Sequence, residues 1–321
     1  MSTNTGSGPD IVTFGETMAL LMPSGGKGLE YSSELHSLFG GAESNVAIGI
    51  SRLGGRVGWF GRLGKDPLGR MIFKKIRGEG VDVSRAELTP TAPTGLMMRD
   101  VLMGKTSVYY YRKNSAASQM SASHLDEAYI AGAKILHVTG ITPALSESCR
   151  EAAFEAVRLA HKHGVKVSFD PNLRLKLWSM EEARPVLLEL AKLADIFLPG
   201  LDELKLLYQT EDWDVIVSKL RELSAISIVK GGEDVTYVVT QDSITTVPYF
   251  KAEHVIDTVG AGDGFCAGFL TGLQKGYDYP EAVRIGNLVG SMIVQTEGDW
   301  EGAPTWEQVE AVLNNTKHVE R

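Results

Sequence analysis

The chain has 321 residues, of which 43% are apolar and 22% are charged, and its formal net charge is −8. These values are typical of a soluble globular protein with a substantial core, and the charge argues against a broad nucleic-acid or anionic-membrane surface. No apolar run approaches the roughly 20 residues of a transmembrane helix, and the polar start lacks the features of a signal peptide. We therefore expect a cytoplasmic protein without a membrane or nucleic-acid partner, in which a small local phosphate site remains compatible with the charge.

Strand-like and helix-like patterns alternate along the chain. Short β-rich runs predict strands at 10–16, 56–64, 133–140, 165–170, 195–200, 225–233 and 234–240. Apolar residues at three- and four-residue spacings predict helices at 42–54, 66–80, 146–164, 183–194, 201–209, 263–275 and 280–297. Such alternation predicts an α/β fold with a mainly parallel central sheet and helices on both faces. Ligands of such sheets bind outside the carboxyl ends of the strands.

Two segments, 17–39 and 90–112, break this alternation. The second is strand-like with turn signals, contains no helical pattern and ends in the aromatic and basic run YYYR. We expect both segments to form a small β-rich lid over the ligand edge of the sheet, with a pair of ordinary hairpins as the alternative. Residues 10–314 would then form one domain, and 1–9 and 315–321 would be flexible termini.

The segment DTVGAGDGF, 257–265, places two acids among three glycines directly before a helical pattern. Its small residues allow close approach to the backbone, and a helix N-terminus offers unpaired N–H groups and the positive end of the macrodipole. This combination predicts a phosphate site. A bound anion would repel Asp263, so the presence of an acid at this position calls for a chemical role. The alternative is that Asp263 only caps the N-terminus of the helix.

Two long segments, GGAESNVAIGISRLGGRVGWFGRLGKDPLGR (40–70) and DTVGAGDGFCAGFL (257–270), resemble the two signatures of the ribokinase-like (PfkB) carbohydrate kinases. The resemblance covers nearly the whole chain and implies a ribokinase-like fold that transfers a phosphoryl group from ATP to a sugar hydroxyl. Asp263 would be the general base, and the amides of Gly260, Ala261 and Gly262 would form the anion hole. An aspartate with a pKa of about 4 would suffice as this base, because the proton of the sugar hydroxyl can leave late in a loose, metaphosphate-like transition state.

The resemblance also assigns the other site residues. The sugar site is expected to include Gly40, Gly41, Asn45, Tyr110, Arg112, Arg174 and Asp263. The ATP site is expected to include Asn172, Lys230, Gly232, Glu233, Gly260, Gly262 and Asn287. A surface hairpin is the alternative for Glu233, and a satisfied core position is the alternative for Asn287.

Mg²⁺ should arrive with ATP, because this ion keeps several waters and relies on substrate phosphates. Glu203 occupies the acid position of the family's N-x-x-E motif, which orders water around Mg²⁺, although Gly200 replaces the asparagine. Asp257, at the start of the catalytic loop, would hold either a nucleotide-side water or a monovalent cation such as K⁺. The sequence leaves these two alternatives open.

Three stretches are most similar to the 2-keto-3-deoxygluconate kinases of this family, namely YYYRKNSAAS (109–118), FDPNLRLKLWS (169–179) and GDWEGAP (298–304). Arg112 and Arg174 would converge on one pocket and suit a carboxylate, whereas a neutral sugar would leave buried positive charge poorly paired. The sequence therefore predicts phosphorylation of the terminal 6-hydroxyl of 2-keto-3-deoxygluconate, a step that feeds the Entner–Doudoroff route.

The alternatives concern the substrate and the class of protein. Arg174 could instead pair with a nearby acid or reach ATP phosphates, and Met97 stands where relatives carry a sugar-contacting aromatic residue. A fructokinase or another neutral-sugar kinase is the first alternative function, and a catalytically inactive sugar-responsive binding protein is the second. The strand edges of the lid favour a homodimer.

Overall fold

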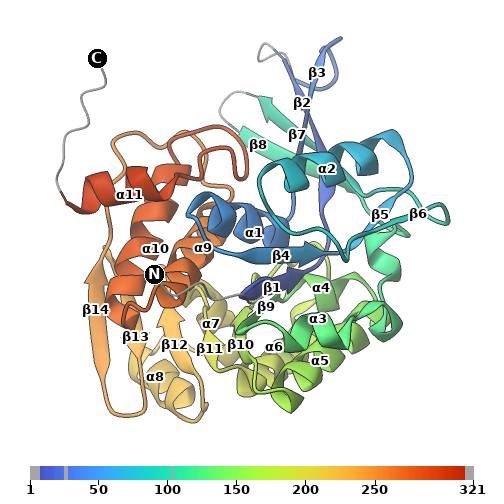
Figure 1. The fold of residues 1–321 in the computed structure, drawn as a ribbon. Coiled ribbons are helices and arrows are strands. Elements are labelled where there is room, and N and C mark those ends of the chain that lie inside the picture. Colours follow the sequence, from blue (N-terminus) through green and yellow to red (C-terminus); the bar gives the residue numbers. More distant parts are fainter. Residues whose placement is uncertain (1–7, 25–27, 103–104, 315–321) are drawn as a thin grey trace, which may run out of the picture.

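The computed structural model describes residues 8–24, 28–102 and 105–314 (Figure 1). The termini predicted to be flexible therefore lie outside the described residues, apart from Gly8 and Pro9.

At the centre is an eight-stranded sheet in the order β14-β13-β12-β11-β10-β9-β1-β4. Its parallel strands are β1 (Ile11–Phe14), β4 (Val57–Phe60), β9 (Ile135–Thr139), β10 (Lys166–Asp170), β11 (Ile196–Phe197) and β12 (Ile226–Val229). The antiparallel edge is made by β13 (Val235–Val239) and β14 (Ile244–Pro248). The predicted mainly parallel sheet is confirmed.

Helices cover both faces of this sheet, each over its own hydrophobic core. One face carries α1 (Ala42–Arg52), α2 (Pro67–Gly78), α9 (Ala261–Gln274) and α10 (Tyr279–Ile293). The other carries α3 (Glu127–Ala131), α4 (Ile141–Leu145), α5 (Glu147–Lys162), α6 (Met180–Leu193), α7 (Leu201–Tyr208) and α8 (Trp213–Arg221). Within the described part of the chain, no helix is both long and apolar enough to cross a bilayer.

Some boundaries differ from those expected. The strand predicted at 56–64 is two strands, because β4 ends before Gly61 and β5 (Arg62–Gly64) turns away to pair with β6 (Glu87–Thr89). A Cβ on Gly61 would lie 2.4 Å from the main-chain oxygen of Gly15, so the chain needs glycine at this close approach. The last helix, α11 (Trp306–Leu313), and the short elements α3, α8 and β14 were not predicted.

The two segments that break the alternation form a separate four-stranded sheet, called the lid here (Figure 1). Its strands are β2 (Met18–Pro23), β3 (Leu35–Gly40), β7 (Leu96–Leu102) and β8 (Lys105–Tyr111), in the order β3-β2-β7-β8. Because only three residues separate the end of β1 from β2, the lid stands at the carboxyl ends of the parallel strands. This is the edge at which a ligand is expected.

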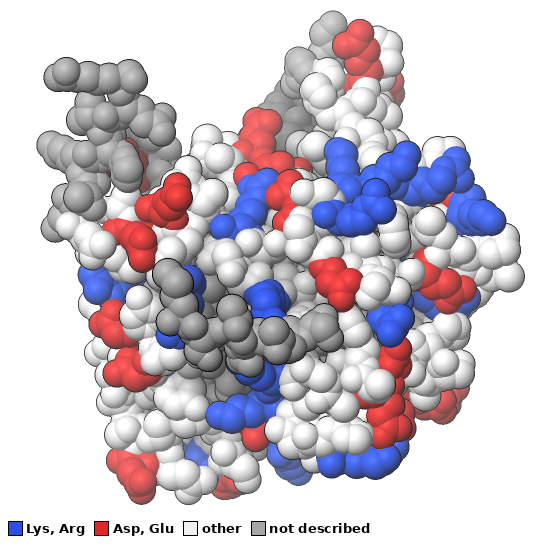
Figure 2. Space-filling model, viewed as in Figure 1, with Lys and Arg blue, Asp and Glu red and all other residues white. Residues whose placement is uncertain are grey.

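Charged side chains are mixed over the face of the molecule drawn in Figure 2. Acidic and basic groups alternate there, and the largest group of Lys and Arg lies over α2. The expectation of no nucleic-acid partner stays a prediction.

Candidate active site

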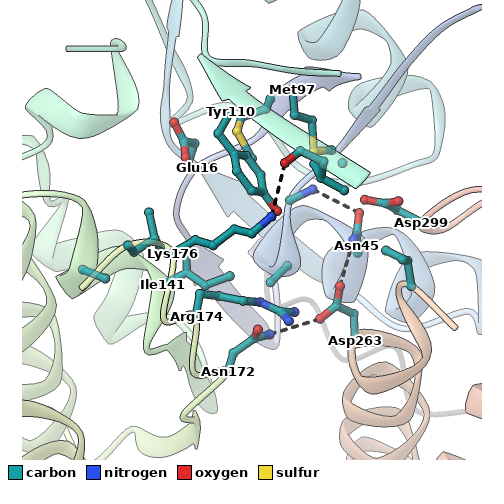
Figure 3. A pocket seen from close by; sticks show the side chains of 18 of the residues that line it. Glu16, Asn45, Met97, Tyr110, Ile141, Asn172, Arg174, Lys176, Asp263 and Asp299 are labelled. Carbon is teal, nitrogen blue, oxygen red and sulfur yellow. Dashed lines mark hydrogen bonds between the residues drawn. The ribbon is translucent and has the colours of Figure 1, made fainter. Parts of the chain in front are cut away.

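A cavity of about 1160 Å³ lies between the lid and the carboxyl ends of the parallel strands (Figure 3). The predicted site residues that line it are Gly40, Gly41, Asn45, Tyr110, Arg112, Asn172, Arg174, Glu203, Lys230, Gly260, Gly262 and Asp263. Met97, from β7 of the lid, lines it as well. Segments far apart in the chain thus meet at the sheet edge where the topology places a ligand.

The first turn of α9 forms one wall of the cavity. Gly260 is its N-cap, with φ at 80°, and a Cβ at this position would lie 1.8 Å from the main-chain oxygen of Asp299. Ala261 N–H points back to the main-chain oxygen of Thr258 at 3.4 Å. Gly262 lines the cavity, and the first N–H groups of a helix have no acceptor within it. The geometry suits an anion, and the phosphate role of this turn stays a prediction.

Asp263 is the third residue of α9 and points into the cavity (Figure 3). It is not the helix N-cap, so the capping alternative is wrong. Asn45 donates a hydrogen bond from Nδ2 to its Oδ2 at 2.8 Å, and Asn172 Nδ2 lies 3.4 Å from Oδ1. Burial raises the pKa of Asp263 to about 7, although the Asn45 hydrogen bond and the charge of Arg174 lower it. The expected pKa of about 4 is therefore wrong, and the ionised carboxylate is a stronger base than a solvated one.

This raised pKa predicts how activity depends on pH. A general base must be ionised, so we expect kcat/KM to fall as the pH is lowered through about 7. The measurement is a pH profile of kcat/KM between pH 5 and 9 at fixed ionic strength, with enzyme stability checked at each pH. A profile that stays flat down to pH 5 would show that Asp263 does not limit the reaction as a base.

Lys230, Asp170 and Glu203 form a partly buried polar cluster that lines the cavity. Lys230 Nζ donates to Asp170 Oδ2 at 3.1 Å. Burial lowers the pKa of Lys230, but the neighbouring groups, led by the charge of Asp170, together outweigh burial and leave the pKa above its usual value. Both oxygens of Glu203 accept main-chain N–H groups, from Leu173 and Gly200, each at 2.7 Å. Burial raises the pKa of Glu203, and its role in ordering water around a metal stays a prediction.

Arg112 is paired within the protein, contrary to the prediction that a substrate carboxylate must neutralise it. Its Nη2 contacts Oε2 of Glu16, whose side chain is fully buried, and Ser115 donates to the other Glu16 oxygen at 2.9 Å. The guanidinium carbon also lies 5.4 Å from the ring centre of Tyr110. Glu16 follows the first strand directly, so its place at a carboxyl strand end was the signal that could have revealed this pair.

Two further cations reach the cavity from the segment after β10. Arg174 points toward Asp263, and Lys176 extends toward Tyr110 (Figure 3). Lys176 Nζ donates to the main-chain oxygen of Val108 in the lid at 3.3 Å and lies 5.7 Å from the Tyr110 ring centre. Among the described residues, neither Arg174 nor Lys176 has an acidic partner within ion-pair distance. Both are exposed to solvent, so the expectation that Arg174 is a buried positive charge is wrong. Lys176 was not predicted as a site residue, although it lies in the FDPNLRLKLWS stretch.

Several residues of the predicted ATP site lie outside the cavity. Asn287 accepts a hydrogen bond from Thr236 Oγ1 at 2.7 Å and donates to the main-chain oxygens of Val247 and Pro248. Its amide thereby ties α10 to β13 and β14, so the satisfied-core alternative describes it better than the adenine pocket. Gly232 and Glu233 lie in the turn between β12 and β13.

Asp299, which the sequence did not single out, lines the cavity between the lid and α9. It is 6% exposed, and its carboxylate contacts Arg99 Nη2 from β7. Asp257 is engaged by the same arginine, since its Oδ2 accepts from Arg99 Nη1 at 2.9 Å and its Oδ1 accepts from Val259 N–H at 3.0 Å. Arg99 thus already contacts the Asp257 carboxylate, which was expected to hold a water or a monovalent cation.

Residues 9–306 match the family model described as the pfkB family carbohydrate kinase. The chain belongs to this family. A 2-dehydro-3-deoxygluconokinase of Bacillus subtilis (strain 168) is 39% identical over 315 residues, which cover 97% of each chain. The probable fructokinase-6, chloroplastic, of Arabidopsis thaliana is 33% identical, over 97% of this chain and 84% of the relative.

Solved structures of pfkB-type kinases share the fold. A PfkB protein from Polaromonas sp. JS666 has a TM-score of 0.87 at 37% identity, over 94% of this chain and 99% of its own. A putative ribokinase II from E. coli in complex with ATP and Mg²⁺ has a TM-score of 0.88 at 25% identity, over 96% and 99% of the two chains. The 2-dehydro-3-deoxygluconokinase of Thermotoga maritima has a TM-score of 0.83 at 25% identity, over 95% and 99%.

These relatives confirm the ribokinase-like fold and the kinase activity expected from the two signature segments. This pfkB kinase transfers a phosphoryl group to an alcohol group of a sugar. Its relatives include sugar-acid and fructose kinases, so the choice between these substrates rests on the residues of the cavity.

Proposed function

We propose that this kinase transfers the γ-phosphate of ATP to the 6-hydroxyl of 2-keto-3-deoxygluconate, which is also called 2-dehydro-3-deoxygluconate. The observation that carries the proposal is that two exposed cations, Arg174 and Lys176, face the cavity and have no acidic partner within ion-pair distance among the described residues. A substrate carboxylate would provide the missing anion through charge-assisted hydrogen bonds. The names of the Bacillus subtilis and Thermotoga maritima relatives support the same substrate.

The chemistry assigned to the cavity is an in-line phosphoryl transfer. The 6-hydroxyl oxygen forms a bond to the γ-phosphorus, the bond from that phosphorus to the ADP oxygen breaks, and the hydroxyl proton passes to Asp263. Asn45 holds the Asp263 carboxylate in place, and the N–H groups at the start of α9 face the charge on the transferred group. With the lid over the sugar, water is kept from the phosphoryl group and ATP hydrolysis is suppressed.

The ATP and Mg²⁺ of the E. coli ribokinase II complex support the same donor here. The described residues contain no group of three or more His, Cys, Asp or Glu that could hold a metal ion, so Mg²⁺ would depend on ATP phosphates. Asp170 and Glu203 would face its waters, and the ion would neutralise phosphate charge. Lys230 lies 4.0 Å from the position of a Cβ on Gly262, which places its charge beside the anion turn. A monovalent cation stays a prediction.

Phosphorylation of fructose is the second candidate function, and one observation favours it. Glu16 neutralises Arg112 inside the protein, so a neutral sugar leaves the charge of this arginine paired with an acid. The fructokinase relative is consistent with this candidate.

Turnover of 2-keto-3-deoxygluconate, fructose, ribose and gluconate with Mg²⁺ and ATP tests the choice. We expect kcat/KM to be highest for the keto-deoxy acid. Lys176→Ala should lower it about tenfold for this acid and leave the value for fructose nearly unchanged, because only the acid loses a charge-assisted hydrogen bond. Lys166→Ala is the matched control, since Lys166 is an exposed lysine at the opposite end of β10.

The outcomes separate the candidates. A preference of the wild-type enzyme for fructose would replace the first candidate by the second. An equal loss with both sugars in Lys176→Ala would show that Lys176 serves the lid and does not read a carboxylate.

The lid has open strand edges on both sides. β3 and β8 are its outer strands, and Tyr109 and Tyr111 of β8 are 52% and 62% exposed. A second copy of the chain could cover such an edge, so the expected homodimer stays a prediction, as does the cytoplasmic location.

A further inference from the structure

Arg99 is a buried cation of the lid that reaches across to two loops of the main body. It lies on β7, two residues after Met97 and on the same face of the strand, and it is 2% exposed. Its two terminal nitrogens bind different acids, Nη1 binding Asp257 at 2.9 Å and Nη2 binding Asp299. One side chain of β7 in the lid is therefore bonded to two loops of the main body, those that contain Asp257 and Asp299.

Both acids hold the turn that starts α9. Asp257 accepts the N–H of Val259, which lies directly before Gly260. The main-chain oxygen of Asp299 packs against Gly260 so closely that a Cβ there would lie 1.8 Å away. Displacing either acid would therefore move the N-cap of α9, the turn proposed to receive the phosphate.

Asp299 also contacts the sugar wall of the cavity. A Cβ on Gly40 would lie 2.0 Å from Asp299 Oδ2, so this carboxylate fills the space that Gly40 leaves open. Asp299 therefore lies between the sugar wall and the anion turn. Its position is fixed by Arg99 on one side and by Glu301, which accepts the Asp299 N–H at 3.0 Å, on the other.

The charges explain why a guanidinium is needed here. Burial raises the pKa of Asp299, and the charge of Arg99 is the largest influence that lowers it. Without Arg99, two carboxylates would converge beside the turn that is to receive a polyanion, and like charges repel. A planar guanidinium can bind two carboxylates in fixed directions at once, which a lysine ammonium does less well.

We propose that Arg99 is a positioning residue that couples the seated lid to the phosphate-binding turn through Asp257 and Asp299. The lid strand that meets the sugar would thereby set the geometry of the amides that meet the phosphoryl group. The coupling goes beyond the choice of substrate, since it acts with whichever sugar the enzyme phosphorylates.

The test compares Arg99→Ala and Arg99→Lys with a matched arginine. Arg52 of α1 holds the same loop, donating from Nη1 to the main-chain oxygens of Glu301 and Ala303 at 2.9 and 3.0 Å, and its ion pair is with Glu79, outside the lid. Each variant is assayed for sugar phosphate and for ADP with the sugar that the wild-type enzyme turns over faster, and for thermal unfolding.

We expect Arg99→Ala to lower kcat by about 10²-fold, as for a small misplacement of catalytic groups, and to release more ADP than sugar phosphate. Added guanidinium ion should restore part of the sugar-phosphate rate in Arg99→Ala only, and Arg99→Lys should lie between Arg99→Ala and wild type. Arg52→Ala should lower the unfolding midpoint and keep ADP and sugar phosphate in equal amounts.

The proposal is overturned if Arg99→Lys has the wild-type kcat, or if Arg99→Ala loses no more kcat than Arg52→Ala and keeps the two products equal. If Arg99→Ala does not fold, the ratio of ADP to sugar phosphate in Arg99→Lys decides: an equal amount of the two products overturns the proposal. Failure of the enzyme to use 2-keto-3-deoxygluconate would refute the proposed substrate and leave this test intact, because the assay uses the faster sugar.

Discussion

Asp263→Asn is expected to lower kcat by about 10³-fold while ATP and sugar still bind. The amide has nearly the shape of the carboxylate and can still accept the hydrogen bond that Asn45 donates, so the cavity keeps its form. It cannot accept the proton of the attacking hydroxyl at any pH in the assay. The measurements are kcat from a coupled ADP assay and binding of both ligands by calorimetry.

The same substitution should raise thermal stability at pH 8. The folded-state pKa of Asp263 is raised to about 7, so stability falls as the pH rises from the unfolded value of about 4 through 7, where the buried group must ionise. Asparagine avoids this cost, and the gain should vanish near pH 4. Asp202→Asn is the control, since Asp202 lies on α7 with its side chain 95% exposed; it should leave kcat unchanged and change the free energy of unfolding by no more than about 1 kcal/mol. Turnover of Asp263→Asn near the wild-type rate would refute the proposed mechanism.

The sequence could predict the main architecture because local patterns determine it. Each buried strand and amphipathic helix carries its own period, and alternation of the two leaves few arrangements besides a parallel sheet covered on both faces. The glycines before a helix indicated an anion site by the same local reasoning, whereas the role of Asp263 as the base came from the resemblance of 257–270 to a family signature. The helix α3 was missed because its five residues are too few for a helical period to emerge.

The charge pairs of the cavity could not be predicted in this way. Arg99 lies 158 residues from Asp257 and 200 from Asp299, and no local pattern links an arginine on a strand to acids so distant. The pairing of Arg112 with Glu16 likewise depends on how the lid folds back over β1. The raised pKa of Asp263 has the same origin, because burial is a property of the assembled cavity.

Gly260→Ala is expected to cost both stability and activity. With φ at 80°, any residue with a side chain is strained by about 1–2 kcal/mol here, and the new Cβ would lie 1.8 Å from the main-chain oxygen of Asp299. Because this neighbour is backbone, relief requires the loop or the N-cap of α9 to move. We expect kcat to fall by about 10²-fold through loss of aligned amides, and the free energy of unfolding to fall by roughly 2–5 kcal/mol.

Gly54→Ala separates the two causes. Gly54 has nearly the same φ, 78°, but nothing lies within 4 Å of its Cβ position, so the variant carries the backbone strain without the clash. It should lose only about 1–2 kcal/mol in a urea titration and keep the wild-type kcat. If Gly260→Ala were no worse than Gly54→Ala in both measurements, the turn would tolerate a side chain, and a tightly fitted anion site at the start of α9 would be excluded. If Gly260→Ala lost much more kcat than Gly54→Ala but the same free energy of unfolding, the displacement would be confined to the turn at the start of α9.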